Sequence, residues 1–119
     1  MSRLSKHFDR EEFACKCGCG FATADFELIE VLENLRETYM APITINSGCR
    51  CPAHNKAVGG EEGSKHMQGI AADIVVQGYS PAKIYQYLDQ KYAGRFGVGE
   101  YKQWVHIDVR STKARWRKV

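Results

Sequence analysis

The chain has 119 residues, a formal net charge of +3, 44% hydrophobic residues and 26% charged residues. This length is typical of one domain and leaves no room for a second hydrophobic core, and the balanced composition excludes disordered and fibrous proteins. The small positive charge is compatible with an anionic polymer as a partner but does not identify one.

The first ten residues contain no apolar stretch of signal-peptide length, and no apolar run approaches the roughly 20 residues of a membrane span. We therefore expect a protein that is synthesised in the cytoplasm without a signal peptide and has no membrane span. We also expect a monomer. Four cations follow one another closely at the end of the chain, within residues 113–119. We interpret this segment as a solvated basic tail, or alternatively as a patch for nucleic acid or an anionic cell-wall polymer.

Capping and periodicity signals predict elements from both secondary-structure classes. Asp9 and Glu12 have the spacing of a capping box, which predicts a short helix that ends before Cys17. Apolar residues recur every three or four positions over 25–39, the pattern of an amphipathic helix. Further signals predict strands at 43–45, 70–76 and 103–109 and helices at 52–58 and 81–92. We expect a single α+β domain over 1–119, with a small, mainly antiparallel sheet flanked by helices.

Three residues form a candidate metal site. Asp73 lies in the apolar run 70–76, where a buried carboxylate needs a compensating partner such as a divalent cation. A turn at Gly69 would allow His66 to lie on a loop beside it. On the strand 103–109, His106 falls on the face opposite the apolar residues. Two imidazoles and one carboxylate suit Zn²⁺ and leave a fourth position for water, as in a catalytic site.

Five cysteines form a second candidate site. They occur in two clusters, and the C-x-C spacing differs from the C-x-x-C of common zinc knuckles. A reducing cytoplasm disfavours disulfides, so metal binding or plain burial also explains them. The alternatives of a second, structural zinc, of disulfides and of unbonded thiols stay open for Cys15, Cys17, Cys19, Cys49 and Cys51.

The segment from Ser64 to Asp73 resembles the S-x-H-x-x-G-x-A-x-D motif of zinc D-Ala-D-Ala carboxypeptidases and murein endopeptidases, which share their metal site with hedgehog domains and lysostaphin-type enzymes. The segment 104–108 is similar to the second metal motif of that family, and 45–50 to its substrate-binding turn. The resemblance extends from Leu4 to Arg110, and the C-x-C-G-C-G opening is similar to peptidases of phages and prophages.

The resemblance implies roles for single residues. His66, Asp73 and His106 become the zinc ligands, Arg50 faces a substrate carbonyl or carboxylate, and Ser64 contacts the bound peptide. Many relatives have a glutamate base three residues before the last histidine, where this chain has Gln103. Glu100 takes the position of the corresponding hedgehog residue and is the expected base, with Asp108 as the alternative.

The sequence as a whole predicts a zinc-dependent peptidase that cleaves an amide bond in peptidoglycan stem peptides or cross-bridges. The localisation that follows from this resemblance is the cell wall of a phage-infected host, or the virion. A catalytically inactive, zinc-stabilised domain that binds cell wall or protein is the alternative, supported by Gln103. A cysteine–zinc module for nucleic acid is disfavoured, because the chain lacks aromatic interleaving and a recognition helix.

Overall fold

The computed structural model describes residues 3–61 and 63–119. None of the described helices is long and apolar enough to cross a membrane. In chain order the elements are η1 (Arg10–Phe13), α1 (Phe26–Tyr39), β1 (Ile43–Ser47), α2 (Pro52–Ala57), η2 (Lys65–Gln68), β2 (Ala71–Val76), α3 (Pro81–Lys91), β3 (Gly97–Tyr101), β4 (Val105–Asp108) and β5 (Ala114–Lys118), where η1 and η2 are short 3-10 helices.

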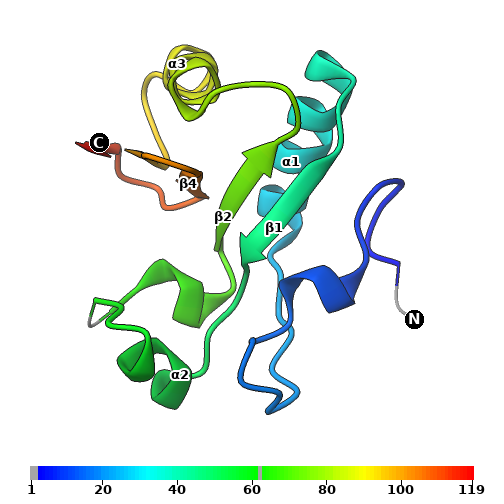
Figure 1. The fold of residues 1–119 in the computed structure, drawn as a ribbon, viewed down its shortest axis with the longest axis vertical. Helices are drawn as coiled ribbons and strands as arrows, with labels where there is room; N and C mark the ends of the chain where they lie inside the picture. Colours follow the sequence, from blue (N-terminus) through cyan, green and yellow to red (C-terminus); the bar gives the residue numbers. More distant parts are fainter. Residues whose placement is uncertain (1–2, 62) are drawn as a thin grey trace.

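The strands form one sheet in the order β1-β2-β4-β3-β5. Three of the four neighbouring pairs are antiparallel, and β3 with β5 is parallel. In Figure 1, α1 lies behind β1 and α3 lies near the top, whereas α2 lies at the opposite end and the N-terminal segment lies on the right-hand side. The expected α+β class with a mainly antiparallel sheet is confirmed.

The two faces of the sheet have different roles, because side chains alternate along each strand. Ile74, Val105 and Val98 point into the apolar core, which α1 and α3 complete with Leu32 and Leu88. The intervening residues of the same strands point to the other face, and there the polar residues of the candidate site lie.

Capping explains where the two long helices begin. Asp25 accepts a hydrogen bond from the backbone N of Glu27 at 2.8 Å, and Ser80 accepts from that of Lys83 at 3.2 Å, followed by proline at the first helical position. These side chains satisfy amides that a helix N-terminus leaves free. The helices predicted at 25–39 and 81–92 are therefore confirmed to within a residue or two, whereas η1 is only a single 3-10 turn.

The sequence interpretation missed two strands. The expected basic tail 113–119 is wrong, because Ala114–Lys118 forms β5. Arg115 fixes it by donating to the Asp89 carboxylate at 2.7 Å and to the carbonyls of Tyr92 and Phe96. The other missed strand, β3, is rich in glycine, which weakens the sequence signal for a strand.

Candidate metal centre

Three side chains converge above the polar face of the sheet. Nε2 of His66 lies 3.3 Å from Oδ1 of Asp73, and Nδ1 of His106 lies 3.1 Å from the same oxygen. One donor atom from each residue lies within 4.8 Å of the other two. Zinc–nitrogen and zinc–oxygen bonds of about 2.1 Å give tetrahedral edges of about 3.4 Å. The donor set and its spacing therefore fit one zinc ion.

Local structure explains how His66 and Asp73 meet. The Ser64 hydroxyl caps η2 by accepting a hydrogen bond from the backbone N of His66 at 3.2 Å. Gly69 then ends η2 with φ of 72°, a left-handed conformation that glycine adopts without strain, and the chain enters β2. A side chain at Gly69 would also press against Thr23. The expected turn at Gly69 is thus confirmed.

The sheet register supplies the third residue. Asp73 of β2 is paired with His106 of β4, so both side chains leave the same face at the same height. All three side chains are buried, with residue exposures of 3% for His66, 9% for Asp73 and 8% for His106. Each donor is therefore held by packed secondary structure and has little freedom to move.

Outer hydrogen bonds determine which imidazole nitrogen faces the centre. Nδ1 of His66 lies 2.6 Å from the carbonyl oxygen of Gly48, which can only accept, so this nitrogen carries the proton. Nε2 of His106 lies 2.8 Å from Oδ2 of Asp108, a carboxylate that accepts in the same way. The other nitrogen of each ring faces Asp73: it donates to this carboxylate when the ring is protonated, and it can bind a metal ion once that proton is lost.

The electrostatics favour a cation at this point. Burial alone would raise the pKa of Asp73, but hydrogen bonds with His106 and His66 outweigh it and hold this pKa well below its usual range. For Asp108, burial is likewise outweighed by hydrogen bonds with His106 and Arg110, so its pKa is also lowered. Burial alone would lower the pKa of His106, but its bonds to Asp108 and Asp73 raise it. Both carboxylates are thus ionised at neutral pH and attract positive charge.

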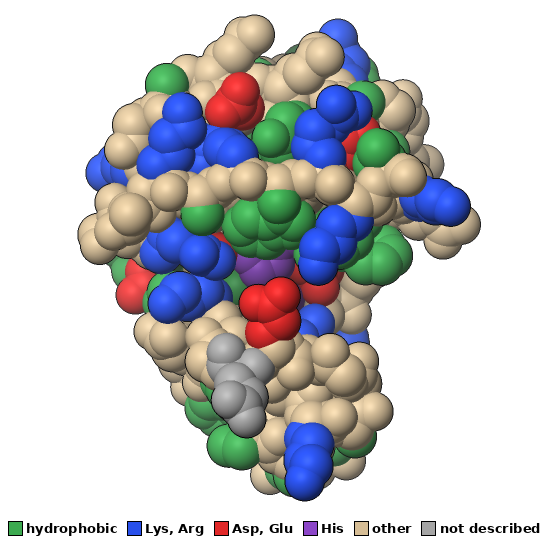
Figure 2. Space-filling view, turned by 90° about the vertical axis from the view of Figure 1, so that its left-hand side faces the viewer, with side chains coloured by type: hydrophobic (Ala, Val, Ile, Leu, Met, Phe, Trp, Pro, Cys, Tyr) green, Lys and Arg blue, Asp and Glu red, His purple; other side chains and the backbone are tan. Residues whose placement is uncertain are grey.

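The three residues line a cleft of about 730 Å³. Figure 2 shows the hollow, with an imidazole visible at its bottom and Lys and Arg side chains on both sides. Trp116 of β5 forms part of the wall, with its ring centroid 5.1 Å from that of His106. The cations that line the cleft are Arg50, Lys65, Arg110 and Lys118.

The Arg50 side chain reaches the metal centre. Its Nη2 lies 3.4 Å from Oδ2 of Asp73, the oxygen that faces away from the histidines. Its other nitrogens donate to Ser47 and Asn55, each at 3.2 Å, which fixes the plane of the guanidinium. Ser64 also lines the cleft, but its hydroxyl already serves as the cap of η2.

The two expected bases do not reach the cleft. Glu100 pairs with Val105 across the sheet and lies on the core face, where its Oε1 accepts from Nε of Arg117 at 2.8 Å. This placement argues against Glu100 as the base. Asp108 is fully buried behind His106, and Arg110 binds both of its oxygens, at 2.8 and 2.7 Å. It is placed to orient the imidazole rather than to meet a substrate.

Trp116 and Glu61 are among the cleft residues that the sequence interpretation missed. Trp116 was hidden in the presumed tail, although the alternation of Ala114, Trp116 and Lys118 with two arginines is a strand pattern. Glu61 is the acidic side chain besides Asp73 that lines the cleft in the part of the chain that the structure describes. It lies in an irregular glycine-rich loop, where the sequence carries no signal for such a role.

Comparison with known proteins agrees with this geometry. A search of curated proteins and a search of solved structures each found no match. The family model described as Peptidase M15 matches residues 6–108, which include all three candidate ligands. Members of this family are zinc-dependent peptidases that act on peptidoglycan peptides. The chain belongs to the Peptidase M15 family.

Proposed function

We propose that this protein is a zinc-dependent peptidase that hydrolyses an amide bond in peptidoglycan stem peptides or cross-bridges. The observation that carries the proposal is the convergence of His66, Asp73 and His106 at the bottom of an open cleft. Three protein donors leave a coordination position for water or substrate, which distinguishes catalytic from structural zinc sites. An endolysin-like role at the cell wall, in a phage-infected host or as part of a virion, belongs to the same proposal.

A zinc ion held by these residues would polarise the scissile carbonyl and lower the pKa of its bound water toward 7. The protein supplies the remaining steps. Arg50 is held rigidly beside Asp73 and retains N–H groups for a substrate oxygen. Such a fixed donor stabilises negative charge that develops on that oxygen in the transition state.

The charge of the cleft supports a substrate with carboxylate groups. Four cations line it, against Glu61 and Asp73 as the acidic side chains among the described residues. Peptidoglycan stems carry free carboxylates, so Lys65 and Lys118 are placed to bind them, whereas Arg110 is already paired with Asp108. The stacked rings of Tyr101 and Trp104, with centroids 4.7 Å apart, give the cleft an apolar stretch of wall.

The general base in this proposal is Glu61. A peptidase of this kind needs a group that takes a proton from the attacking water and returns it to the leaving amine. Glu100 lies on the other face of the sheet and Asp108 lies behind His106, so neither is placed for this step. Glu61 is exposed and lines the cleft, where its carboxylate can meet a bound peptide.

Digestion of defined muropeptides tests the proposal. The zinc-loaded protein is incubated with muropeptides that end in D-Ala-D-Ala and with cross-linked dimers, and the products are weighed by mass spectrometry. New amino termini that appear with zinc and disappear after chelation support a peptidase, and the masses distinguish a carboxypeptidase from an endopeptidase. Intact muropeptides with a fully loaded metal centre would contradict it and favour an inactive binding domain.

A further inference from the structure

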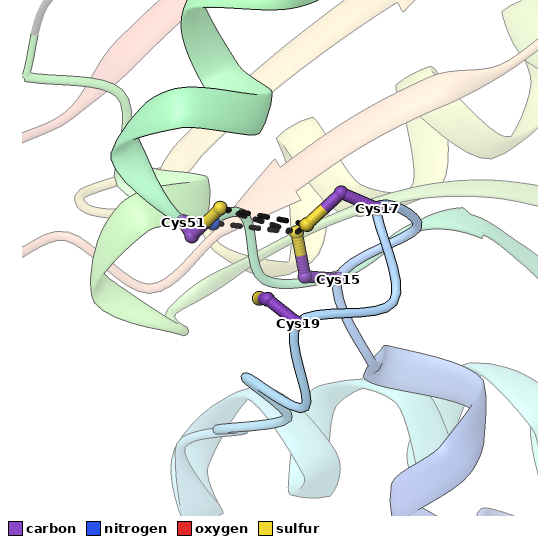
Figure 3. A group of neighbouring side chains, drawn as sticks. All are labelled: Cys15, Cys17, Cys19 and Cys51. Carbon is purple, nitrogen blue, oxygen red and sulfur yellow. Dashed lines mark hydrogen bonds between the residues drawn. The ribbon is translucent and has the colours of Figure 1, made fainter.

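A second group of metal-binding side chains lies outside the cleft. The Sγ atoms of Cys15, Cys17, Cys19 and Cys51 all lie within 4.8 Å of one another. Figure 3 shows three of these cysteines on the loop that follows η1, with Cys51 facing them from the start of α2. Four thiols from segments 36 residues apart therefore meet at one point.

The distances between the sulfur atoms fit a metal–thiolate site better than a disulfide. Cys15 and Cys17 lie 3.4 Å apart, Cys17 and Cys51 3.6 Å, and Cys15 and Cys51 3.8 Å. A disulfide has its sulfurs about 2.05 Å apart. Tetrahedral zinc with zinc–sulfur bonds of about 2.3 Å places its sulfurs about 3.8 Å apart. The observed spacing thus exceeds that of a disulfide and approaches that of a tetrahedron around zinc.

The fifth cysteine is separate from this group. Cys49 is buried, and its Sγ donates to the carbonyl oxygens of Phe13 at 3.1 Å and Phe21 at 3.0 Å. These bonds satisfy the thiol without a metal. The chain therefore divides its cysteines into a group of four that converge and one that is an ordinary buried residue.

The backbone around the group is shaped to present sulfur atoms. Gly18 and Gly20 have φ of 83° and 93°, so the loop turns twice within six residues. The backbone N of Cys51 donates to Sγ of Cys15, and that of His54 donates to Sγ of Cys51, both at 3.4 Å. Such N–H donors stabilise the negative charge of thiolates.

We propose that Cys15, Cys17, Cys19 and Cys51 bind a structural zinc ion, distinct from the ion at His66, Asp73 and His106. Four thiolates close a tetrahedral site and leave no position for substrate. The ion would join the loop that follows η1 to the N-terminus of α2. Because Cys51 follows Arg50 directly in the sequence, the bound ion would also fix the backbone next to Arg50.

Metal analysis of the unmodified protein gives the first test. We expect two zinc ions per chain, and an X-ray absorption spectrum with a sulfur shell at about 2.3 Å beside the nitrogen and oxygen shell. Replacement by cobalt should add the intense thiolate-to-cobalt charge-transfer absorption. One zinc per chain with a spectrum free of sulfur would overturn the proposal, as would iron in the thiolate site or disulfides among the four cysteines.

Two matched variants locate the ion. Cys19→Ser removes one of the four thiols at an exposed position, and we expect it to lose the sulfur shell while the nitrogen and oxygen shell remains. Cys49→Ser changes the same residue type outside the group, and we expect it to keep both ions. The assignment would be contradicted if both variants lost the sulfur shell, or if both kept it. Because these readouts are independent of hydrolysis, failure here leaves the proposed peptidase activity intact, and the reverse holds as well.

Discussion

Two clusters of side chains that could bind a metal ion lie in the described part of the chain, and they differ in their structural support and in their donor atoms. His66, Asp73 and His106 project from η2 and two central strands, and their outer hydrogen bonds end on Gly48 and Asp108. The four cysteines come mostly from a loop whose glycines have left-handed conformations, and two of them are exposed. A mixed donor set on a rigid sheet suits chemistry, whereas four sulfurs on a loop suit stabilisation.

The sheet supports its site before any metal binds, because strand pairing and core packing already fix the donors. The loop has little packing of its own, so an ion there would contribute to folding. We therefore expect substitutions at the His66, Asp73 and His106 site to change activity, and substitutions at the cysteine site to change stability.

The site formed by His66, Asp73 and His106 is called the sheet site below. Removal of one of its ligands should have the largest effect on peptidase activity. His66→Ala should lower peptidase activity on the order of 10³-fold or more, since loss of the metal removes several kcal/mol of transition-state stabilisation. Metal analysis should show one zinc fewer, with the sulfur shell retained. His54→Ala on α2 is the control and should keep both activity and metal. Full activity in His66→Ala would refute the assignment of this site.

Substitution of the proposed base should separate chemistry from metal binding. Glu61→Gln keeps the size of the side chain but cannot accept the proton, so activity should fall about 10² to 10⁴-fold. Both zinc ions should remain, in contrast to His66→Ala. Glu100→Gln, on the opposite face of the sheet, is the matched control and should leave the pH profile of hydrolysis unchanged. If the two variants behaved alike, the base would lie elsewhere.

Asp108→Asn should weaken the sheet site alone. Asp108 orients His106 and is held in turn by Arg110, and loss of such an outer partner typically costs 10 to 100-fold in metal affinity or activity. Competition with a chelator of known affinity measures the change at each site. Asp89→Asn removes a surface partner of Arg115 and should leave zinc affinity unchanged. An unchanged affinity in Asp108→Asn would mean that His106 is oriented by its packing.

The smallest effect is expected for Glu33, which binds the N-terminal segment, and it should appear in the free energy of unfolding. Glu33 of α1 accepts from the backbone N and Nδ1 of His7 at 2.7 and 2.6 Å, and from the hydroxyl of Ser5. Burial alone would raise the pKa of Glu33, but these bonds outweigh it and lower the pKa. Glu33→Gln should therefore cost about 1–3 kcal/mol of unfolding free energy at neutral pH.

The sign of the pH dependence follows from this lowered pKa. The unfolded chain takes up a proton at Glu33 near pH 4.3, whereas the folded chain holds it ionised to lower pH. The contribution of Glu33 to stability is thus complete above about pH 4.3 and is lost as the pH falls through the folded pKa. Denaturant unfolding of the metal-free protein between pH 3 and 7 measures this, and Glu33→Gln should flatten the curve. Glu30→Gln on the same helix is the control.

Much of the sheet site could be predicted from the sequence, because its signals are local. Asp73 is a carboxylate within an apolar run and therefore needs a partner, and Gly69 marks the turn before it. Because side chains alternate along a strand, His106 and Val105 lie on opposite faces. The base could not be predicted in the same way. The face on which Glu100 lies depends on β3, and that strand was hidden because Gly97 and Gly99 have low strand propensity. The structure explains these glycines, since a Cβ would collide with Asp108 at the first and with Trp116 at the second.

The cysteine site shows a different limit. The sequence gives five thiols in two clusters, and the choice of four requires knowledge of where the backbone turns. Cys49 and Cys51 are neighbours in the sequence, yet only Cys51 caps α2 and faces the loop, while Cys49 points to the carbonyls of Phe13 and Phe21. In irregular backbone the direction of side chains does not repeat with a fixed period, so it cannot be predicted from the spacing of residues in the sequence.

The last strand has one more consequence. β5 forms an outer edge of the sheet, and there unpaired backbone amides and carbonyls would invite a strand from another molecule. Arg117 and Lys118 are exposed on this strand, and exposed cations on an edge strand disfavour pairing with a second copy. Removal of the strand would expose the glycine-rich β3, which carries no such cations. The exposed cations of β5 therefore disfavour edge-to-edge association, while Trp116, between the two arginines, forms part of the wall of the cleft.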